Sequence, residues 1–166
     1  MSPLLGLTDF ILILFFLIIA IVAPLFDAQS ILPRHFYPKL LLDLSSHYAA
    51  EYGDYLVEER PHFFVGLVWM ELVVLWPLSV VNLVGLLGGK GWFARSCLVF
   101  GVSMTTSMVA ILSELIGSGR ASYKLLKMYF PFLGLALLAF VRGLVSSSGK
   151  IADSGKRVVF ARKKRA

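Results

Sequence analysis

The chain has 166 residues, of which 58% are hydrophobic and 16% are charged. A soluble domain carries roughly 25% charged residues and keeps much of its surface in water, so this composition excludes a soluble enzyme or a secreted domain. The net charge is +6, but eight of the sixteen lysines and arginines lie from Arg142 onward, beside an apolar segment. Such a basic run is typical of the cytosolic flank of a membrane helix. We therefore expect an integral membrane protein that binds membrane lipids and no nucleic acid.

Four apolar segments are long enough to cross a roughly 30 Å hydrocarbon core as helices. They span residues 7–26, 62–87, 93–116 and 125–145. An isolated apolar strand would leave its backbone groups unpaired in lipid, so the predicted fold class is an all-α membrane protein, a four-transmembrane-helix bundle. The first segment is interpreted as a retained helix rather than a signal peptide, because it lacks a positively charged start.

The connections between these segments are of two kinds. Short glycine-containing turns at residues 88–91 and 117–120 predict that helices two, three and four are antiparallel neighbours. The linker between helices one and two runs over about 35 residues, from Asp27 to Pro61, and carries six of the ten acidic residues. An apolar run at residues 40–44, followed by three tyrosines, predicts short amphipathic helices at the membrane face.

The lysines and arginines predict the orientation. Ten of them lie on the side of the C-terminal tail and six on the other side. The positive-inside rule then places both termini in the cytosol and the long linker on the luminal side. We expect two parts, a transmembrane domain over residues 1–145 and a basic cytosolic tail over residues 146–166.

Glu71 is the residue with the clearest chemical implication. It lies inside the second apolar segment, roughly 13 Å from its start at about 1.5 Å per residue. An ionised, unpaired carboxyl group at that depth is costly, so Glu71 is expected to be protonated, paired or facing a cavity. Two interpretations stay open: a carboxyl group that serves a ligand site or handles protons, and a protonated glutamic acid that joins two helices.

Asp27 is the expected partner of Glu71. It ends the first apolar segment on the side from which the second helix starts. Two carboxyl groups in a low-dielectric site titrate as a coupled pair, and such a pair suits a buried amine or acid–base chemistry. The alternative is that Asp27 only caps the linker.

No other residue indicates a reaction. Pro77 and Pro131 predict kinks, which either open an internal cavity or only shape the helices. Cys97 is a single cysteine in an apolar stretch, so no intrachain disulfide is expected, and the three histidines are interpreted as linker surface residues. Motifs for a nucleophile elbow, a phosphate loop and a zinc protease are absent, so no catalytic residue, metal site or cofactor is predicted.

One long motif and several short ones carry a family resemblance. The long motif is Phe26-Asp27-Ala28-Gln29-Ser30-Ile31-Leu32-Pro33-Arg34-His35-Phe36-Tyr37-Pro38, and the short ones are Glu71-Leu72-Val73 with Trp76-Pro77, Met104-Thr105-Thr106 with Ile111-Leu112-Ser113, and Tyr129-Phe130-Pro131-Phe132. They resemble the first luminal loop and helices two, three and four of the sigma-2 receptor (transmembrane protein 97) family. The resemblance covers nearly the whole chain up to about residue 145.

This resemblance implies a member of the EXPERA group, related to the emopamil-binding sterol isomerases. Such proteins are four-helix proteins of the endoplasmic reticulum membrane, and they form homodimers. They bind sterols and cationic amphiphilic amines in a pocket that opens towards the membrane. It further implies that Asp27 pairs with the ligand amine and that Glu71 hydrogen-bonds to Asp27. The implied ligand-binding or pocket-supporting residues are Asp27, Glu71, Tyr48, Asp54, Thr106 and Tyr129. The end of the chain, from Lys163, resembles a cytosolic dilysine retrieval signal.

The chain departs from the family pattern at two positions. Leu75 stands where a glutamine is expected in animal members, and Phe132 where a tyrosine is expected, so polar contacts are lost and ligand preference is expected to differ.

Three functions remain after these observations. The expected function is a non-catalytic, receptor-like protein that binds sterols and amphiphilic amines and takes part in cholesterol handling. A sterol double-bond isomerase is the alternative, and a membrane trafficking adaptor is the third. The isomerases pair a histidine with a glutamate one turn apart, whereas Leu67 lies one turn before Glu71, which counts against an enzyme.

Overall fold

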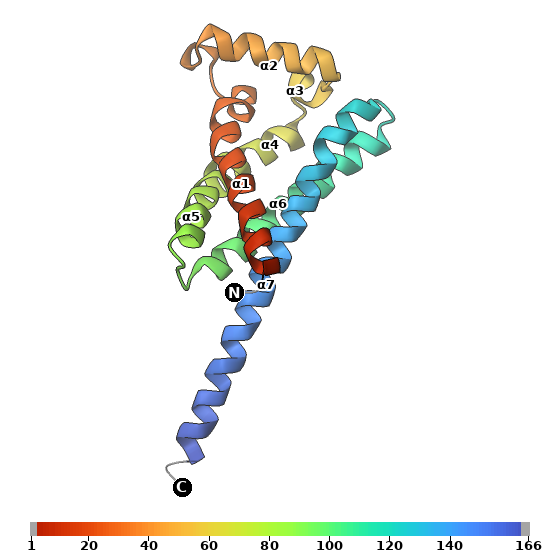
Figure 1. The fold of residues 1–166 in the computed structure, drawn as a ribbon. Coiled ribbons are helices and arrows are strands. Elements are labelled where there is room, and N and C mark those ends of the chain that lie inside the picture. Colours follow the sequence, from red (N-terminus) through yellow and green to blue (C-terminus); the bar gives the residue numbers. More distant parts are fainter. Residues whose placement is uncertain (1–2, 164–166) are drawn as a thin grey trace.

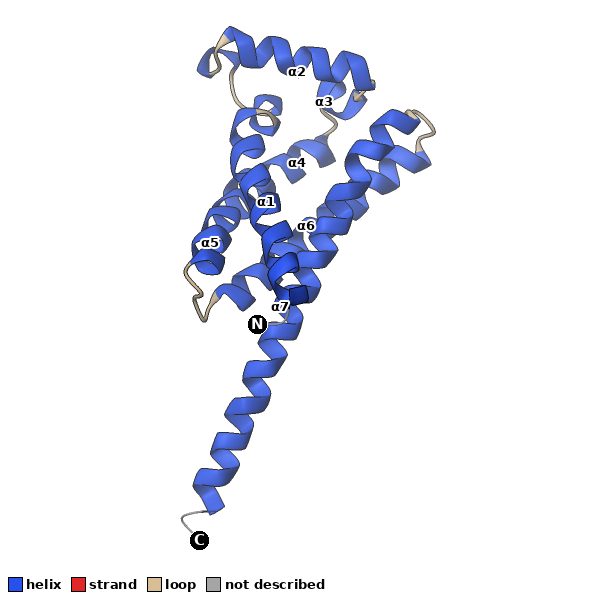
Figure 2. Cartoon of the chain, in the orientation of Figure 1, coloured by secondary structure: helices blue, strands red, loops and turns tan. Residues whose placement is uncertain are grey.

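The computed structural model describes the backbone of residues 3–163 and the side chains of residues 6–145. Within these residues the chain is helical and contains no strand (Figures 1 and 2). Four stretches of the described chain are long and apolar enough to cross a membrane. The membrane-spanning elements are α1 (Pro3–Leu25), then α4 (His62–Met70), η3 (Glu71–Leu75) and α5 (Trp76–Leu87) as one continuous span, α6 (Phe93–Gly117) and α7 (Tyr123–Lys163). This confirms the predicted four-helix membrane fold.

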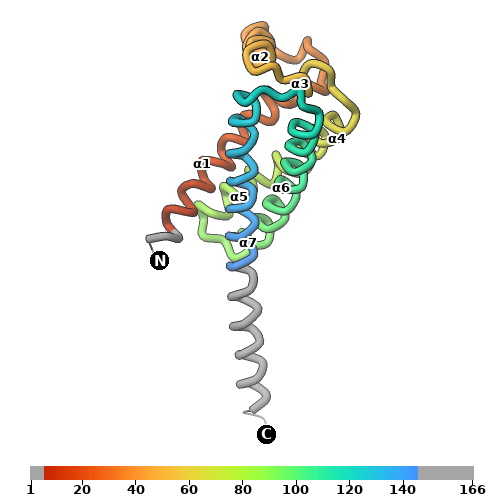
Figure 3. Tube along the Cα trace, turned by 90° about the vertical axis from the view of Figure 1, so that its right-hand side faces the viewer, coloured from red at the N-terminus to blue at the C-terminus, as the bar shows by residue number. Residues whose placement is uncertain are grey.

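The linker between the first two spans folds into short helices. They are η1 (Asp27–Ser30), η2 (Arg34–Phe36), α2 (Lys39–Tyr52) and α3 (Tyr55–Glu59). In Figures 1 and 3, α2 lies across one end of the bundle, which we call the linker end. Gly53 ends α2 with φ of 66°, a left-handed conformation that glycine adopts without strain. The prediction of short helices in the linker is confirmed.

The second span changes its winding at Glu71. The residues Glu71–Leu75 form a π-helical turn, in which the amide of Trp76 donates to the carbonyl of Glu71. Pro77 follows directly and has no amide hydrogen, so a regular helix would lose a hydrogen bond at this point. The indole Nε1 of Trp76 donates to the carbonyl of Ala20 at 3.0 Å and so joins this turn to α1. The interruption therefore coincides with Glu71, the acidic residue inside this span, and π turns recur at functional sites.

Apolar packing fills the half of the bundle away from the linker end. Phe15, Phe16 and Phe100 are at most 1% exposed, and the rings of Phe16 and Phe100 meet edge to face at 5.1 Å. Asp9 and Arg142 close this half with an ion pair between α1 and α7, with Nε and Oδ1 2.7 Å apart. The linker half is left with room for a cavity.

The last span is the partner of α6. The two helices run side by side as antiparallel neighbours in Figures 1 and 3, as the short turn before α7 predicts. The α7 helix passes through Pro131 and continues beyond the predicted end of the span at Val145. The basic tail predicted over residues 146–166 lies outside the residues whose side chains are described, and it stays a prediction.

Two glycines set the spacing of α6 and α7. A Cβ atom at Gly101 would overlap the backbone of Phe140, and one at Gly143 would overlap the backbone of Leu98. Gly134, also on α7, has nothing within 4 Å of an added Cβ. We expect Gly101→Ala and Gly143→Ala each to destabilise the protein by about 1–3 kcal/mol, because the helices must move apart. Thermal unfolding in detergent measures this, with Gly134→Ala as the control; equal effects of the three substitutions would contradict it.

Candidate ligand-binding site

A cavity of about 470 Å³ lies inside the bundle near the linker end. Its wall combines α1, α2, the second span, α6 and α7, so all four spans contribute to it. Most of the lining side chains are apolar or aromatic, including Ile19, Phe64, Met104, Met108 and Phe132. Cavities of this size and character are typical of sites for small apolar molecules.

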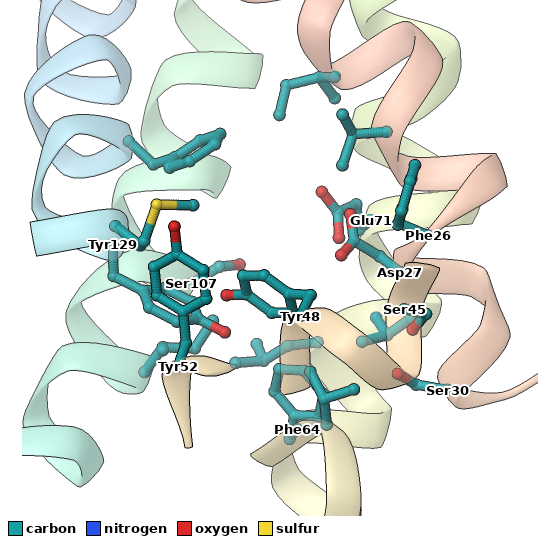
Figure 4. Close-up of a pocket in the computed structure, with 18 of the residues that line it drawn as sticks. Phe26, Asp27, Ser30, Ser45, Tyr48, Tyr52, Phe64, Glu71, Ser107 and Tyr129 are labelled. Atoms are coloured by element: carbon teal, nitrogen blue, oxygen red, sulfur yellow. The ribbon is translucent and has the colours of Figure 1, made fainter. Parts of the chain in front are cut away.

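Asp27, at the start of η1, and Glu71, at the start of the π turn, are two of the three acidic residues that line this cavity; the third, Glu51, pairs with Lys124. The carboxyl groups of Asp27 and Glu71 lie next to each other in Figure 4, close enough for a Coulomb interaction. Neither carboxyl group has a hydrogen-bond donor or a cationic side chain beside it among the described residues. Two such groups in an apolar surrounding repel each other when both are charged, and a cation between them relieves that repulsion. The meeting of Asp27 and Glu71 that the sequence suggested is therefore present.

The chain around Asp27 is held by hydrogen bonds to the end of α1. The amide of Phe26 donates to the carbonyl of Val22, and the hydroxyl group of Tyr37 donates to the carbonyl of Pro24 at 3.1 Å. These bonds satisfy carbonyl groups at the end of the span and fix the turn into η1. Asp27 thus reaches the cavity from a helix end that is held by hydrogen bonds.

Asp54 organises a second polar group behind the cavity wall. It is fully buried, and its Oδ2 accepts from the hydroxyl groups of Tyr48 at 3.2 Å and Tyr129 at 2.8 Å. Its Oδ1 accepts from the amide of Leu56 as the N-cap of α3. Burial and the adjacent Asp54 charge raise the pKa of Tyr48, so its phenol stays neutral and donates at neutral pH. Tyr48 and Tyr129 line the cavity, while Asp54 holds them in place.

The structure does not bring Thr106 to the cavity. Its side chain is exposed, and its hydroxyl group donates to the carbonyl of Val102 within α6. The next residue, Ser107, is 4% exposed and lines the cavity instead. Successive residues of a helix point about 100° apart, so a shift of one position exchanges the buried face for the exposed one.

Both departures from the family pattern line the cavity. Leu75 lies in the π turn and is 1% exposed, and Phe132 projects from α7. Their side chains are apolar, so the wall offers no hydrogen bond at either position. The cavity is accordingly more apolar than the family pattern implies.

Several lining residues were missed by the sequence analysis. His47, interpreted as a linker surface residue, is 76% exposed but stands at the edge of the cavity, where its Nε2 lies 3.4 Å from Glu51. Leu44 and Tyr52 were also missed, and they line the cavity together with Tyr48, which the resemblance implied. Their spacing of four residues places them on one face of α2, and this periodicity was the signal that identifies the face.

Two exposed ion pairs connect the linker to the turn before α7 and to the first turn of α7. The guanidinium of Arg120 pairs with Glu59, and Lys124 Nζ lies 2.6 Å from Glu51. The hydrogen bond from Arg120 lowers the pKa of Glu59, and the one from Lys124 lowers the pKa of Glu51. Exposed pairs contribute little to stability, but together they hold α2 and α3 over the cavity on the α7 side.

The fold and the cavity define a multi-pass membrane protein with an internal, mostly apolar pocket in which the carboxyl groups of Asp27 and Glu71 lie side by side. The sequence pattern of the EXPERA family (expanded EBP superfamily) matches residues 40–143. The chain belongs to this family, as the resemblance implied.

Three similar proteins carry the name Sigma intracellular receptor 2. The chain is 25% identical to Sigma intracellular receptor 2 from Xenopus tropicalis over 146 residues, which is 80% of this chain and 85% of the relative. It is 31% identical to the proteins of the same name from Macaca fascicularis and Homo sapiens over 91 residues, which is 54% of this chain and 52% of each relative. The similarity to proteins named Sigma intracellular receptor 2 therefore extends along most of the chain.

The three hydrogen bonds that Asp54 accepts lead to a prediction about the stability of the protein. Asp54→Ala removes the acceptor of two tyrosine hydroxyl groups and the cap of α3, so we expect a loss of about 2–3 kcal/mol. Thermal unfolding of the purified protein measures it. Glu59→Gln, which changes an exposed carboxylate on the same short helix, is the matched control and should have little effect. Equal stability of Asp54→Ala and wild type would show that the network does not hold the linker.

Proposed function

We propose that this protein is a receptor-like binding protein that holds sterols and cationic amphiphilic amines in the cavity and takes part in sterol and cholesterol handling. The observation that carries the proposal is the pair of adjacent carboxyl groups, Asp27 and Glu71, which no cationic side chain of the described residues neutralises. A ligand amine supplies the missing positive charge. The remaining wall supplies apolar contact for the body of the ligand.

The proposed binding mode follows from the position of the two acids. Asp27 pairs with the ammonium group, and Glu71 hydrogen-bonds to Asp27 and fixes its orientation. The apolar part of the ligand lies against Met104, Met108 and Phe132 on the opposite wall. In a low-dielectric cavity a charge-assisted hydrogen bond is stronger than in water, which favours an amine over a neutral ligand of the same shape.

The cellular setting is part of the same proposal. Relatives named Sigma intracellular receptor 2 support an intracellular membrane, and we propose the endoplasmic reticulum, with both termini in the cytosol and the linker end in the lumen. The excess of lysine and arginine on the tail side supports this orientation. Assembly as a homodimer is proposed from the family resemblance.

A sterol isomerase is the alternative within the same family. That reaction protonates one carbon and removes a proton from another, so it needs an acid and a base beside the sterol ring. Leu67, one helical turn before Glu71, lines the cavity with an apolar side chain at the position where the isomerases place a histidine. This supports binding over catalysis. The role of a trafficking adaptor makes no use of the carboxyl pair.

The proposal predicts which carboxyl groups the amine needs. We expect a tritiated cationic amphiphile to bind wild type saturably, and Asp27→Asn to lower its affinity by about 30-fold because the direct charge pair is lost. Glu71→Gln, which changes only the supporting group, should lower it by about tenfold. Equilibrium binding to the purified protein measures both.

Asp43→Asn is the matched control for this experiment. Asp43 is an exposed carboxylate on α2 that does not line the cavity, so its loss should leave affinity unchanged. Absence of saturable binding to wild type, or equal affinity of Asp27→Asn and wild type, would reject the amine site. Conversion of a sterol double bond by the purified protein would favour the isomerase instead.

A further inference from the structure

A second cavity of about 270 Å³ adjoins the first at the linker end and has a different character. It is lined for the most part by polar and charged side chains, among them Gln29, Ser30, Ser45, Arg34, Glu58 and Arg60. We propose that it binds the phosphate group of an amphiphile whose amine and apolar chain occupy the first cavity. The inference deepens the proposed function and rests on it for the placement of the amine.

The two cavities share part of their wall. Ser30, Ser45 and Val57 line both of them, and Figure 4 shows Ser30 and Ser45 at the same end of the first cavity as Asp27. Ser30 is only 7% exposed, yet its hydroxyl group has no hydrogen-bond partner among the described residues. Ser30 lines both cavities, so this hydroxyl group is available to hydrogen-bond a ligand there. The shared wall therefore offers free donors on the path from Asp27 to the second cavity.

The short helix η1 sets the spacing along this path. Asp27 and Ser30 are three residues apart in a 3-10 helix, in which side chains three apart lie on the same face, roughly 6 Å apart along the axis. Gln29 connects η1 to the end of α1 and to α2, because its Nε2 donates to the carbonyl groups of Leu25 at 2.6 Å and Leu41 at 3.3 Å. This spacing suits an ammonium group and a phosphate on neighbouring carbon atoms of one ligand.

Two guanidinium groups supply the positive charge. Arg60 ends α3 with φ of 52°, and its Nε donates to the carbonyl of Val57 at 3.4 Å. Among the described residues, neither Arg60 nor Arg34 pairs with a carboxylate, in contrast to Arg120, which pairs with Glu59. Glu58 lines the same cavity, so the net charge of its lining is +1. The planar guanidinium group fits phosphate oxygens better than any other side chain.

The order of charges along the two cavities defines the ligand class. Apolar wall comes first, then the carboxyl pair at Asp27, then the serine hydroxyl groups, and last the two arginines. The matching molecule has a long apolar chain, an amine near its end and a terminal phosphate ester. The reversed order would bring the phosphate against Asp27, where like charges repel.

The test compares a long-chain amino alcohol with its phosphate ester, both tritiated, by equilibrium binding to the purified protein. We expect the ester to bind wild type about tenfold more tightly, and this advantage to fall as salt is added. Arg60→Gln and Arg34→Gln should each reduce the advantage without changing the affinity for the amino alcohol. Glu58→Gln should increase it, because the one opposing charge in the lining is removed.

Lys39→Gln is the control for these variants. Lys39 is an exposed cation at the start of α2 that lines neither cavity, so its loss should leave the advantage of the ester unchanged. Equal melting temperatures of the arginine variants and wild type would show that they fold. If the ester binds wild type no more tightly than the amino alcohol, or keeps its advantage in the Arg34→Gln/Arg60→Gln double variant, the proposal is rejected.

Two further arms separate the outcomes. Failure of the amino alcohol to bind wild type would reject the amine site. A long-chain alkyl phosphate without an amine then tests the second cavity alone. Binding of this phosphate that requires Arg60 would support the phosphate site, and absence of binding would reject the phosphate site. Inorganic phosphate distinguishes the source of the anion. If it displaces the ester at millimolar concentration, the cavity is a site for free anions and the assignment to an amphiphile is overturned; if it does not, the apolar chain is required.

Discussion

The position of the linker over the bundle depends on one buried carboxylate. Asp54 is fully buried and accepts hydrogen bonds from Tyr48 on α2, from Tyr129 on α7 and from the backbone at the start of α3. A buried carboxylate is tolerated only where several donors surround it, and these donors come together in one arrangement of the three helices. The position of α2 and α3 over the cavity thus depends on Asp54, which does not itself line the cavity.

Tight packing and the cavity occupy different halves of the bundle. Away from the linker the aromatic side chains of α1 and α6 fill the interior, and Gly101 and Gly143 let α6 and α7 approach until their backbones touch. Stability of the membrane domain comes from this half, since packing rather than the hydrophobic effect drives helix association in lipid. The linker half can therefore carry an open cavity and the acidic pair of Asp27 and Glu71, both of which weaken a purely structural bundle.

The sequence predicts the membrane spans and the approach of the two acidic residues, which depend on hydrophobic length and charge. It does not predict which side chains of a helix point into the cavity. The four spans follow from hydrophobic length, and the meeting of Asp27 and Glu71 follows from the depth of Glu71 and the side on which Asp27 ends the first span. Thr106 shows the limit, because a change of about 100° in direction separates it from Ser107, which lines the cavity. The second cavity was not predicted either, since it forms only where η1, α2 and α3 meet, and no local pattern encodes that junction.

The charged groups at the linker end fall into two kinds with different consequences. Two exposed ion pairs, Glu51 with Lys124 and Glu59 with Arg120, connect the linker to the α7 side. They hold α2 and α3 over the cavity. The charged groups of Asp27, Glu71, Arg34 and Arg60 line cavities and form no ion pair among the described residues. Asp27 and Glu71 line the first cavity and Arg34 and Arg60 the second, and Ser30 and Ser45 line both, so a molecule that carries a cation and an anion would complement both sets of charges.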